Sequence, residues 1–276
     1  MASSSNPPHP PLVPPPWRIA GEVYLIAVSG SINNHSPAFY SPMEAESDFA
    51  SEEKSGKFRG GAAGGSVMIV RYTSSSVGPY DELAYIPGKF DTPDGKKHWR
   101  TTNIYVSSED SVYNGRLHWN IPKHLAIFSF TPLSEKSKTI RIEVSMPSLV
   151  ASSTKNPPFF MALCTPFRYM PSFPFNTKYI PFFDVMFTQP PLPGSPSSYS
   201  EVGTKEWKTI TADLKGKATF TRVRPAGGEG LEEGELADGI HFPKIKPLFG
   251  IHLKGMDMEL LAAIETTNDK NEGFKL

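Results

Sequence analysis

The sequence predicts a mainly β protein (β-rich α+β), in which antiparallel sheets form a half-closed barrel or cone around a buried cavity. Short segments rich in β-branched and aromatic residues recur between turns that carry glycine and proline. Helical periodicity is nearly absent, and 28 prolines argue against a helical protein. Because such sheets commonly enclose a ligand cavity, we expect the functional site there.

The two ends of the chain differ in composition from its middle. Residues 1–16 hold seven prolines and almost nothing to bury, which predicts a disordered or polyproline-type arm. Ordered structure is expected from Trp17, as a single β domain over residues 17–265 with a flexible tail at 266–276. Residues 30–65 are polar, then glycine-rich, and predict a long loop, which in a compact domain is usually mobile or functional.

The expected strands follow one another along the chain at 22–29, 66–73, 101–107, 126–131, 139–146, 159–165, 181–188 and 217–224. The clearest alternation is in 139–146, which places Ile140, Ile142, Val144 and Met146 on one face. Residues 257–265 are the best helix candidate, although the same pattern fits a strand.

The bulk chemistry excludes several classes of partner. With 28 basic and 28 acidic residues, no global field favours nucleic acid or an anionic membrane. The N-terminus lacks the basic and apolar regions of a secretory signal, and no apolar run approaches the roughly 18 residues that span a bilayer. Cys164 is the single cysteine, in an apolar stretch typical of a buried core thiol. We therefore expect a cytoplasmic protein.

Several familiar sites have no support in the sequence. There is no phosphate-binding G-x-x-x-x-G-K-[ST] loop, no G-x-S-x-G nucleophile elbow, and no H-E-x-x-H or cysteine pair that would indicate zinc. The prediction is a protein without metal or cofactor.

Functional groups concentrate in two stretches. Residues 77–90 join Asp81 and Glu82 to an apolar run. Residues 111–125 otherwise look like protein interior, yet they carry Arg116, His118, Trp119, Asn120, Lys123 and His124.

Lys123 is the best candidate for chemistry. A lysine with the ordinary pKa near 10.4 is an ammonium at neutral pH and cannot attack a carbonyl. Burial or a neighbouring cation lowers that pKa, and the aliphatic neighbours of Lys123, together with His124 and Arg116, could do so. A neutral amine can form a Schiff base with a ketone. The alternative is a surface lysine that follows a turn-forming proline.

The segment 115–123, GRLHWNIPK, resembles the G-R-E-x-x-x-x-P-K signature of the acetoacetate decarboxylase family. The resemblance implies that Lys123 forms the Schiff base. Upstream, Tyr80, Glu82, the Ile86–Pro87 pair and Phe90 resemble the family's Y-x-E-x-x-x-x-I-P-x-x-F stretch, whose glutamate lies in the active site. The family fold, a β-rich half-closed cone, agrees with the architecture expected above.

The sequence also departs from the family pattern. His124 stands where a second lysine follows the reactive one, and Leu117 replaces the glutamate after Gly-Arg. Gly21 falls where the family has a substrate-binding arginine, and Val67 where it has a second pocket glutamate. Acetoacetate is therefore a doubtful substrate, and a more apolar pocket is expected.

The remaining site residues are expected on this basis. The candidate pocket walls are Val67, Leu117 and Trp119. The candidate groups that bind a substrate carboxylate or tune the lysine are Arg71, Arg116, His118 and His124.

The favoured hypothesis is a lysine-dependent lyase, foremost a decarboxylase of a β-keto acid or polyketide-like substrate, with Lys123 as nucleophile and Glu82 in proton transfer. The alternatives are aldolase, dehydratase or cyclase chemistry through the same imine, or a non-enzymatic cavity that binds an apolar small molecule. The resemblance further implies a homo-oligomer. The sequence as a whole looks most like fungal-type members of the family, which suggests a role in secondary metabolism.

Overall fold

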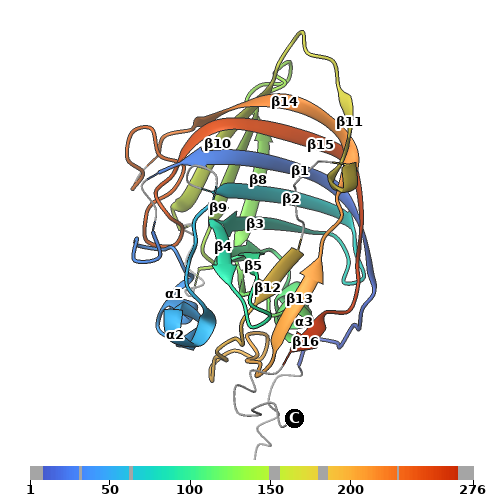
Figure 1. The fold of residues 1–276 in the computed structure, drawn as a ribbon. Helices are drawn as coiled ribbons and strands as arrows, with labels where there is room; N and C mark the ends of the chain where they lie inside the picture. The colour runs from blue at the N-terminus through green and yellow to red at the C-terminus, as the bar shows by residue number, and fades with distance from the viewer. Residues whose placement is uncertain are drawn as a thin grey trace, which may run out of the picture.

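A long, curved antiparallel sheet makes up most of the molecule (Figure 1). The computed structural model describes residues 9–30, 33–61, 65–148, 156–179, 186–228 and 230–266. In spatial order the sheet contains β7 (Lys123–Leu125), β6 (Asn103–Val106), β3 (Tyr80–Ile86), β2 (Ser66–Ser74), β1 (Trp17–Ser29), β15 (Lys246–Leu260), β14 (Lys215–Pro225), β10 (Pro158–Pro166), β9 (Ile140–Ser145) and β8 (Ile127–Pro132). A further strand, β11 (Phe173–Asn176), pairs with β14. Only β6 and β7 run parallel within this described sheet.

A second, smaller sheet closes one side of the large one. Its strands are, in spatial order, β16 (Ile264–Thr266), β13 (Trp207–Thr211), β12 (Met186–Gln189), β5 (Lys97–Arg100) and β4 (Gly88–Asp91). Trp99, Phe187 and Ile210 of this sheet line the same cavity as residues of β1, β2, β3 and β15. The barrel-shaped arrangement confirms the predicted fold class.

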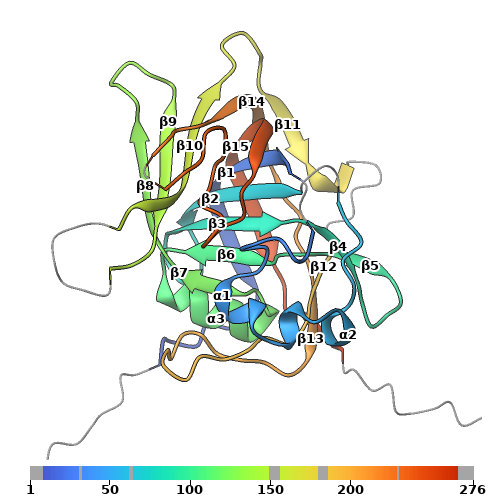
Figure 2. The ribbon, with the colours of Figure 1, turned by 90° about the vertical axis from the view of Figure 1, so that its left-hand side faces the viewer.

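The central strands β1 to β3 are buried on both faces. Val23 and Val70 belong to the core cluster beside the cavity, whereas Ile26, Val67 and Leu83 belong to a second cluster on the other face. That second cluster includes buried residues of β9, of β10 and of the segment 236–245. Figure 2 shows β8, β9 and β10 rising at one side of the sheet.

The long loop expected over residues 30–65 contains short helical turns in its described part. They are α1 (Pro42–Ala45), the 3-10 turn η1 (Asp48–Ala50) and α2 (Glu52–Ser55); another 3-10 turn, η2 (Thr177–Tyr179), follows β11. Phe39 and Phe49 from this segment are each 1% exposed and lie in the core, so apolar burial holds it in place.

The structure agrees with the predicted strands wherever it describes them. The prediction for 139–146 is confirmed by β9, in which Ile142 and Val144 are fully buried. Residues 257–265, the helix candidate, continue β15 and begin β16 instead. Part of the strand expected at 181–188, residues 181–185, lies outside the described residues.

The sequence analysis missed most of β15 and several shorter strands, and it also missed the helix α3 (Glu109–Trp119). Its buried residues include Ser111, Asn114, Gly115 and Arg116 besides two apolar side chains, so it has no apolar stripe of helical period.

The proline-rich arm is ordered in its described part, residues 9–16, although disorder was expected from its composition. The Asn114 side chain on α3 accepts a hydrogen bond from the Val13 amide (2.8 Å) and donates one to the Pro11 carbonyl (2.9 Å). Trp17 Nε1 donates to the Val13 carbonyl at 3.0 Å. These bonds pair backbone groups of a proline-rich segment that cannot form the regular hydrogen bonds of a β-sheet. The rest of the arm, 1–8, and the tail 267–276 lie outside the described residues. Across the described ranges, no helix is long and apolar enough to cross a membrane.

Candidate active site: a lysine and a glutamate in an apolar cavity

Helix α3 and its caps bring Lys123 to the cavity. At the N-terminus of α3 the Ser108 side chain accepts a hydrogen bond from the Ser111 amide (3.3 Å). The negative charges of Glu109 and Asp110 in the first turn interact favourably with the positive end of the helix dipole. At the C-terminus Asn120 is left-handed (φ 53°) and caps the helix. The chain therefore reverses, and β7 begins at Lys123.

The Lys123 side chain crosses α3 at Gly115. A Cβ atom at position 115 would lie 2.6 Å from Lys123 Cδ and 2.9 Å from Cε. Glycine at this position therefore leaves the space through which the lysine reaches the cavity.

The ammonium group of Lys123 meets one carboxylate and two hydroxyls. Its Nζ lies 2.9 Å from Glu82 Oε2, 3.0 Å from Ser111 Oγ and 3.4 Å from the Tyr80 hydroxyl. Tyr72 donates from its hydroxyl to the other Glu82 oxygen, Oε1, at 3.1 Å. The lysine and the glutamate are thus held from both sides by neutral hydrogen-bonding groups.

Burial and the ion pair oppose each other at Lys123. Lys123 and Glu82 are each 4% exposed. Desolvation disfavours the ammonium, but the Glu82 carboxylate and the Tyr80 hydroxyl outweigh it, so the pKa of Lys123 is raised. The expectation of a lowered lysine pKa is therefore wrong, because a carboxylate, and not a second cation, is the nearest charged group.

The two tyrosines of this network are neutral hydrogen-bonding groups. Burial and the neighbouring Glu82 charge raise the pKa of Tyr72 well above its ordinary value. Burial also raises the pKa of Tyr80, although Lys123 acts in the opposite direction.

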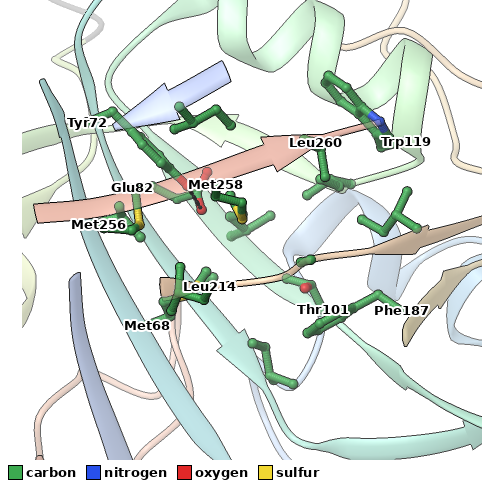
Figure 3. A pocket seen from close by; sticks show the side chains of 18 of the residues that line it. Met68, Tyr72, Glu82, Thr101, Trp119, Phe187, Leu214, Met256, Met258 and Leu260 are labelled. Atoms are coloured by element: carbon green, nitrogen blue, oxygen red, sulfur yellow. Dashed lines mark hydrogen bonds between the residues drawn. The ribbon is translucent and has the colours of Figure 1, made fainter. Parts of the chain in front are cut away.

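The cavity that these groups face has a volume of about 200 Å³ and a mainly apolar wall (Figure 3). Methionine and leucine side chains of β2 and β15 and of the segment after β13 surround it, as the labelled Met68, Met256, Met258, Leu214 and Leu260 show. Glu82 and Lys123 are the only charged residues among the described residues that line it. A ligand here meets an aliphatic and aromatic surface with one ion pair.

Comparison with known proteins identifies the fold. No protein-family model matches the sequence, and no curated protein matches it. Among solved structures, acetoacetate decarboxylase from Legionella pneumophila superposes with a TM-score of 0.56 at 12% identity, over 96% of this chain and 93% of that one. The chain has the acetoacetate decarboxylase-like fold.

Two further solved structures share this fold. The enduracididine biosynthesis enzyme MppR, complexed with the condensation product of pyruvate and imidazole 4-carboxaldehyde, gives a TM-score of 0.54 at 13% identity, over 94% of this chain and 92% of that one. An acetoacetate decarboxylase-like enzyme from Sphingomonas wittichii gives 0.53 at 11% identity, over 91% and 93%. At these identities the likeness concerns the fold alone.

Within this acetoacetate decarboxylase-like fold, strand alternation decides which predicted residues reach the cavity. On β2, the residues at 66, 68, 70 and 72 line it. Val67 and Arg71 have the opposite parity, so the predictions that they serve as a pocket wall and a carboxylate partner are wrong. Val67 lies in the second core cluster, and Arg71 contacts Glu22, Asp81 and the Phe130 ring on that face.

Arg116 also points away from the cavity. Its buried guanidinium donates to Glu44 Oε1 (2.9 Å) and to the carbonyls of Pro193 (2.6 Å), Val202 (3.0 Å) and Lys123 (3.3 Å). The expectation that it binds substrate is wrong. It holds the backbone of the lysine from behind.

His124 belongs to the same group of charges. Its Nε2 lies 2.7 Å from Glu44 and its Nδ1 2.7 Å from Glu201. Burial disfavours the imidazolium, but the hydrogen bonds to Glu201 and Glu44 outweigh it and raise the pKa of His124 to about 9. The imidazolium is therefore neutralised by two carboxylates on the side of β7 opposite the Lys123 side chain, because consecutive strand residues point to opposite faces. It does not stand in for the family's second lysine.

Of the other predicted residues of α3, one lines the cavity and two do not. Trp119 lines the cavity and is 1% exposed. Among the described residues, Leu117 and His118 are not part of the cavity wall. The Leu117 carbonyl accepts from Lys208 Nζ (2.6 Å), and burial with the Lys208 charge lowers the pKa of His118. Their predicted roles as pocket wall and substrate ligand are wrong, because neither residue is among the described residues that line the cavity.

Gly21 cannot be replaced by a side chain that reaches the cavity. A Cβ atom there would lie 2.1 Å from the Arg71 carbonyl oxygen, at an irregularity of register in β1. Lys123 is therefore the one cation among the described lining residues. No group of metal-ligating side chains is found in the part of the chain that the structure describes.

Sequence reasoning missed several members of the site. Tyr72 follows from alternation with Met68 and Val70 once β2 is paired with β3. The capping signal Ser108-Glu109-Asp110 predicts α3 and would have placed Ser111 and Gly115 on a helix beside Lys123. No signal in the sequence connects Glu44 or Glu201 to the residues beside the lysine, since Glu44 comes from the short helix α1 and Glu201 from a loop, each far from residues 116–124 in the chain.

Proposed function

We propose that this protein is a lysine-dependent enzyme that forms a Schiff base between Lys123 and an apolar keto compound, and that it decarboxylates a β-keto acid. One observation carries the proposal: Lys123 and Glu82, with Nζ and Oε2 2.9 Å apart, are the sole charged pair in the described wall of an otherwise apolar cavity. A charge pair is expensive to bury, and functional sites are where such pairs are retained.

The ion pair supplies its own base. A neutral amine is needed for attack, and Glu82 is within hydrogen-bond distance of the ammonium proton. Transfer of that proton to Glu82 converts the pair into an amine and a carboxylic acid. The transfer becomes easier when a ligand excludes water, because a low-dielectric site disfavours separated charges.

The reaction then proceeds through an imine. The Lys123 nitrogen attacks the ketone carbon, the carbinolamine takes a proton from Glu82 and loses water, and a cationic imine remains. In a β-keto acid the bond to the carboxyl carbon breaks, carbon dioxide leaves, and the electron pair forms a neutral enamine. A solvent proton relayed through Glu82 adds to the enamine carbon, and water releases the ketone and Lys123.

The wall chemistry selects the substrate class. A small carboxylate such as acetoacetate finds no cation except Lys123 among the described residues of the wall. Longer alkyl or aryl β-keto compounds bury apolar surface against Met68, Met258 and Leu260, at about 25 cal/mol per Å².

Borohydride trapping tests the proposal. We would incubate the protein with acetoacetate, with alkyl and aryl β-keto acids, and with pyruvate plus an aromatic aldehyde, reduce with borohydride and read peptide masses. We expect an adduct on Lys123 and carbon dioxide release with the apolar β-keto acids, both absent in Lys123→Ala. The absence of any adduct from the folded protein across the panel would refute the proposal. An adduct without carbon dioxide release would support imine formation but would indicate an aldol or dehydration reaction instead of decarboxylation. A condensation product of this kind is bound in the MppR structure.

The raised pKa of Lys123 favours a second candidate function, a cavity that binds an apolar small molecule without reaction. In that case the Lys123–Glu82 ion pair only holds β3 and β7 together at the cavity wall. The same ligands would then bind reversibly and equally well to Lys123→Met, and no adduct would form.

A further inference from the structure

Gln189, the last residue of β12, is an unexplained polar group in the cavity wall. It is 0% exposed and lines the cavity. Neither its Nε2 nor its Oε1 has a hydrogen-bond partner among the residues that the structure describes. Both halves of a buried amide are thus left to whatever occupies the cavity.

The position of Gln189 is fixed by its neighbours. Phe187, two residues earlier on the same strand face, lines the same cavity and pairs in parallel with Trp99 of β5. Gln189 lies two residues after Phe187 on β12, and Thr101 lies two residues after Trp99, just past the end of β5; both line the cavity. Immediately after Gln189, the carbonyl of Pro190 accepts from the Asn120 side chain at 3.0 Å, which ties this strand end to the cap of α3.

This end of the cavity is separate from the ion pair. Figure 3 shows Thr101 and Phe187 on one side of the cavity, with Tyr72 and Glu82 on the other. A ligand that reaches both must therefore be extended, with its keto group at Lys123 and a second polar group at Gln189.

Physical chemistry restricts what that second group can be. A buried amide without partners is costly, and a site with unpaired polar atoms rejects ligands that cannot satisfy them. Gln189 offers one acceptor oxygen and two N–H donors. A carboxylate would satisfy the donors only, and no cation lies among the described lining residues at this end. A neutral group with both a donor and an acceptor satisfies both.

We infer that Gln189 anchors the far end of the ligand through a neutral donor–acceptor group, in the manner of a primary carboxamide, so that the substrate is an apolar chain or ring with a keto group at one end and such a group at the other. The Gln189 anchor rests on the cavity being the ligand site, as proposed above, and is independent of the imine chemistry, on which only the keto group at the other end depends. In the complex the ligand N–H donates to Gln189 Oε1, and Gln189 Nε2 donates to the ligand carbonyl.

Calorimetric titration with two probes that lack a ketone tests this anchor. The probes are 3-phenylpropanamide and 3-methylbutylbenzene, which have similar shapes and differ in the amide. The proteins are the wild type, Gln189→Met, which keeps the volume and removes the polar atoms, and Met258→Leu as a matched change in the apolar wall.

We expect the ratio of the amide Kd to the hydrocarbon Kd to rise at least about tenfold in Gln189→Met and to stay unchanged in Met258→Leu. An unchanged ratio in Gln189→Met, or no binding of the amide by the wild type, would overturn the anchor. If Gln189→Met does not fold, Gln189→Leu takes its place.

Because neither probe reacts with an amine, the two proposals can fail separately. Amide selectivity without borohydride adducts would leave the anchor and remove the imine reaction. Adducts on Lys123 without amide selectivity would do the reverse.

Discussion

Replacing Glu82 by glutamine leaves Lys123 as a buried cation without a carboxylate. Both side chains are 5% exposed, and the Nζ–Oε2 distance of 2.9 Å allows no intervening water. In the wild type the ion pair raises the pKa of Lys123, so the lysine stabilises the fold below its unfolded pKa near 10.4, and this stabilisation is lost as pH rises through the folded value. In Glu82→Gln only the Tyr80 and Ser111 hydroxyls oppose burial, so we expect the folded pKa of Lys123 to be lowered, which reverses the sign.

The magnitude has a ceiling, since the buried lysine can deprotonate. Relative to the unfolded chain, holding the amine neutral costs about 1.4 kcal/mol for each pH unit below 10.4, or about 5 kcal/mol at pH 7 and about 2 kcal/mol at pH 9. Breaking a buried pair from one side typically costs about 3–5 kcal/mol, which agrees with this ceiling. Glu82→Gln should therefore be strongly destabilised at neutral pH and recover as pH rises toward 10.

Urea unfolding of the wild type and Glu82→Gln at several pH values between 6.5 and 9.5 measures the effect. The control is the double variant Glu82→Gln/Lys123→Met, which removes both charges and should recover most of the stability at pH 7. A loss below about 1 kcal/mol at pH 7, or one that does not change with pH, would refute the account of Lys123 as a buried, carboxylate-dependent cation.

Two further predictions concern the groups around the lysine. Gly115→Ala places a Cβ 2.6 Å from Lys123 Cδ and should displace the lysine, so that the rate of borohydride trapping falls at least about tenfold and the urea midpoint falls as the buried ion pair is disturbed; an unchanged rate would contradict the crossing geometry. His124 has a folded pKa of about 9, so it stabilises the fold fully below pH 6.5 and loses that effect as pH rises through 9. His124→Gln should therefore cost about 3 kcal/mol at pH 6 and less at pH 9.5, and direct NMR titration of the imidazole near its ordinary value of 6.5 would contradict this.

The site was predictable from sequence where residues close in the chain are also close in space. Lys123 and Glu82 follow from the two motifs, and the structure places both at the cavity, as it does Trp119. The roles proposed for them stay predictions until trapping is measured. Four assignments failed because the residue lies on a face of its strand or helix that does not line the cavity: Val67 and Arg71 on β2, and Leu117 and His118 on α3. A strand alternates every residue, so a motif alignment that is one position out inverts its meaning.

The remaining errors came from charges that meet only after folding. His124 and Arg116 are adjacent to the lysine in sequence and were expected to tune it, but both are engaged by Glu44, about 70 to 80 residues earlier in the chain. Similarly, the pKa of Lys123 is decided by Glu82 across the sheet. An electrostatic shift depends on distances of a few ångströms between groups, which sequence neighbours alone do not supply.

The sequence by itself determined the strand-rich architecture, the positions of about half of the described strands and the lysine and glutamate worth examining, because β-propensity, alternation and turn chemistry are local properties. Only the tertiary structure decided which face of each strand meets the cavity, that Lys123 is paired with a carboxylate, and that the Gln189 amide has no hydrogen-bond partner among the described residues. Those features depend on how β2, β3, β7 and β12 are brought together from distant parts of the chain, and long-range pairing has no local signal.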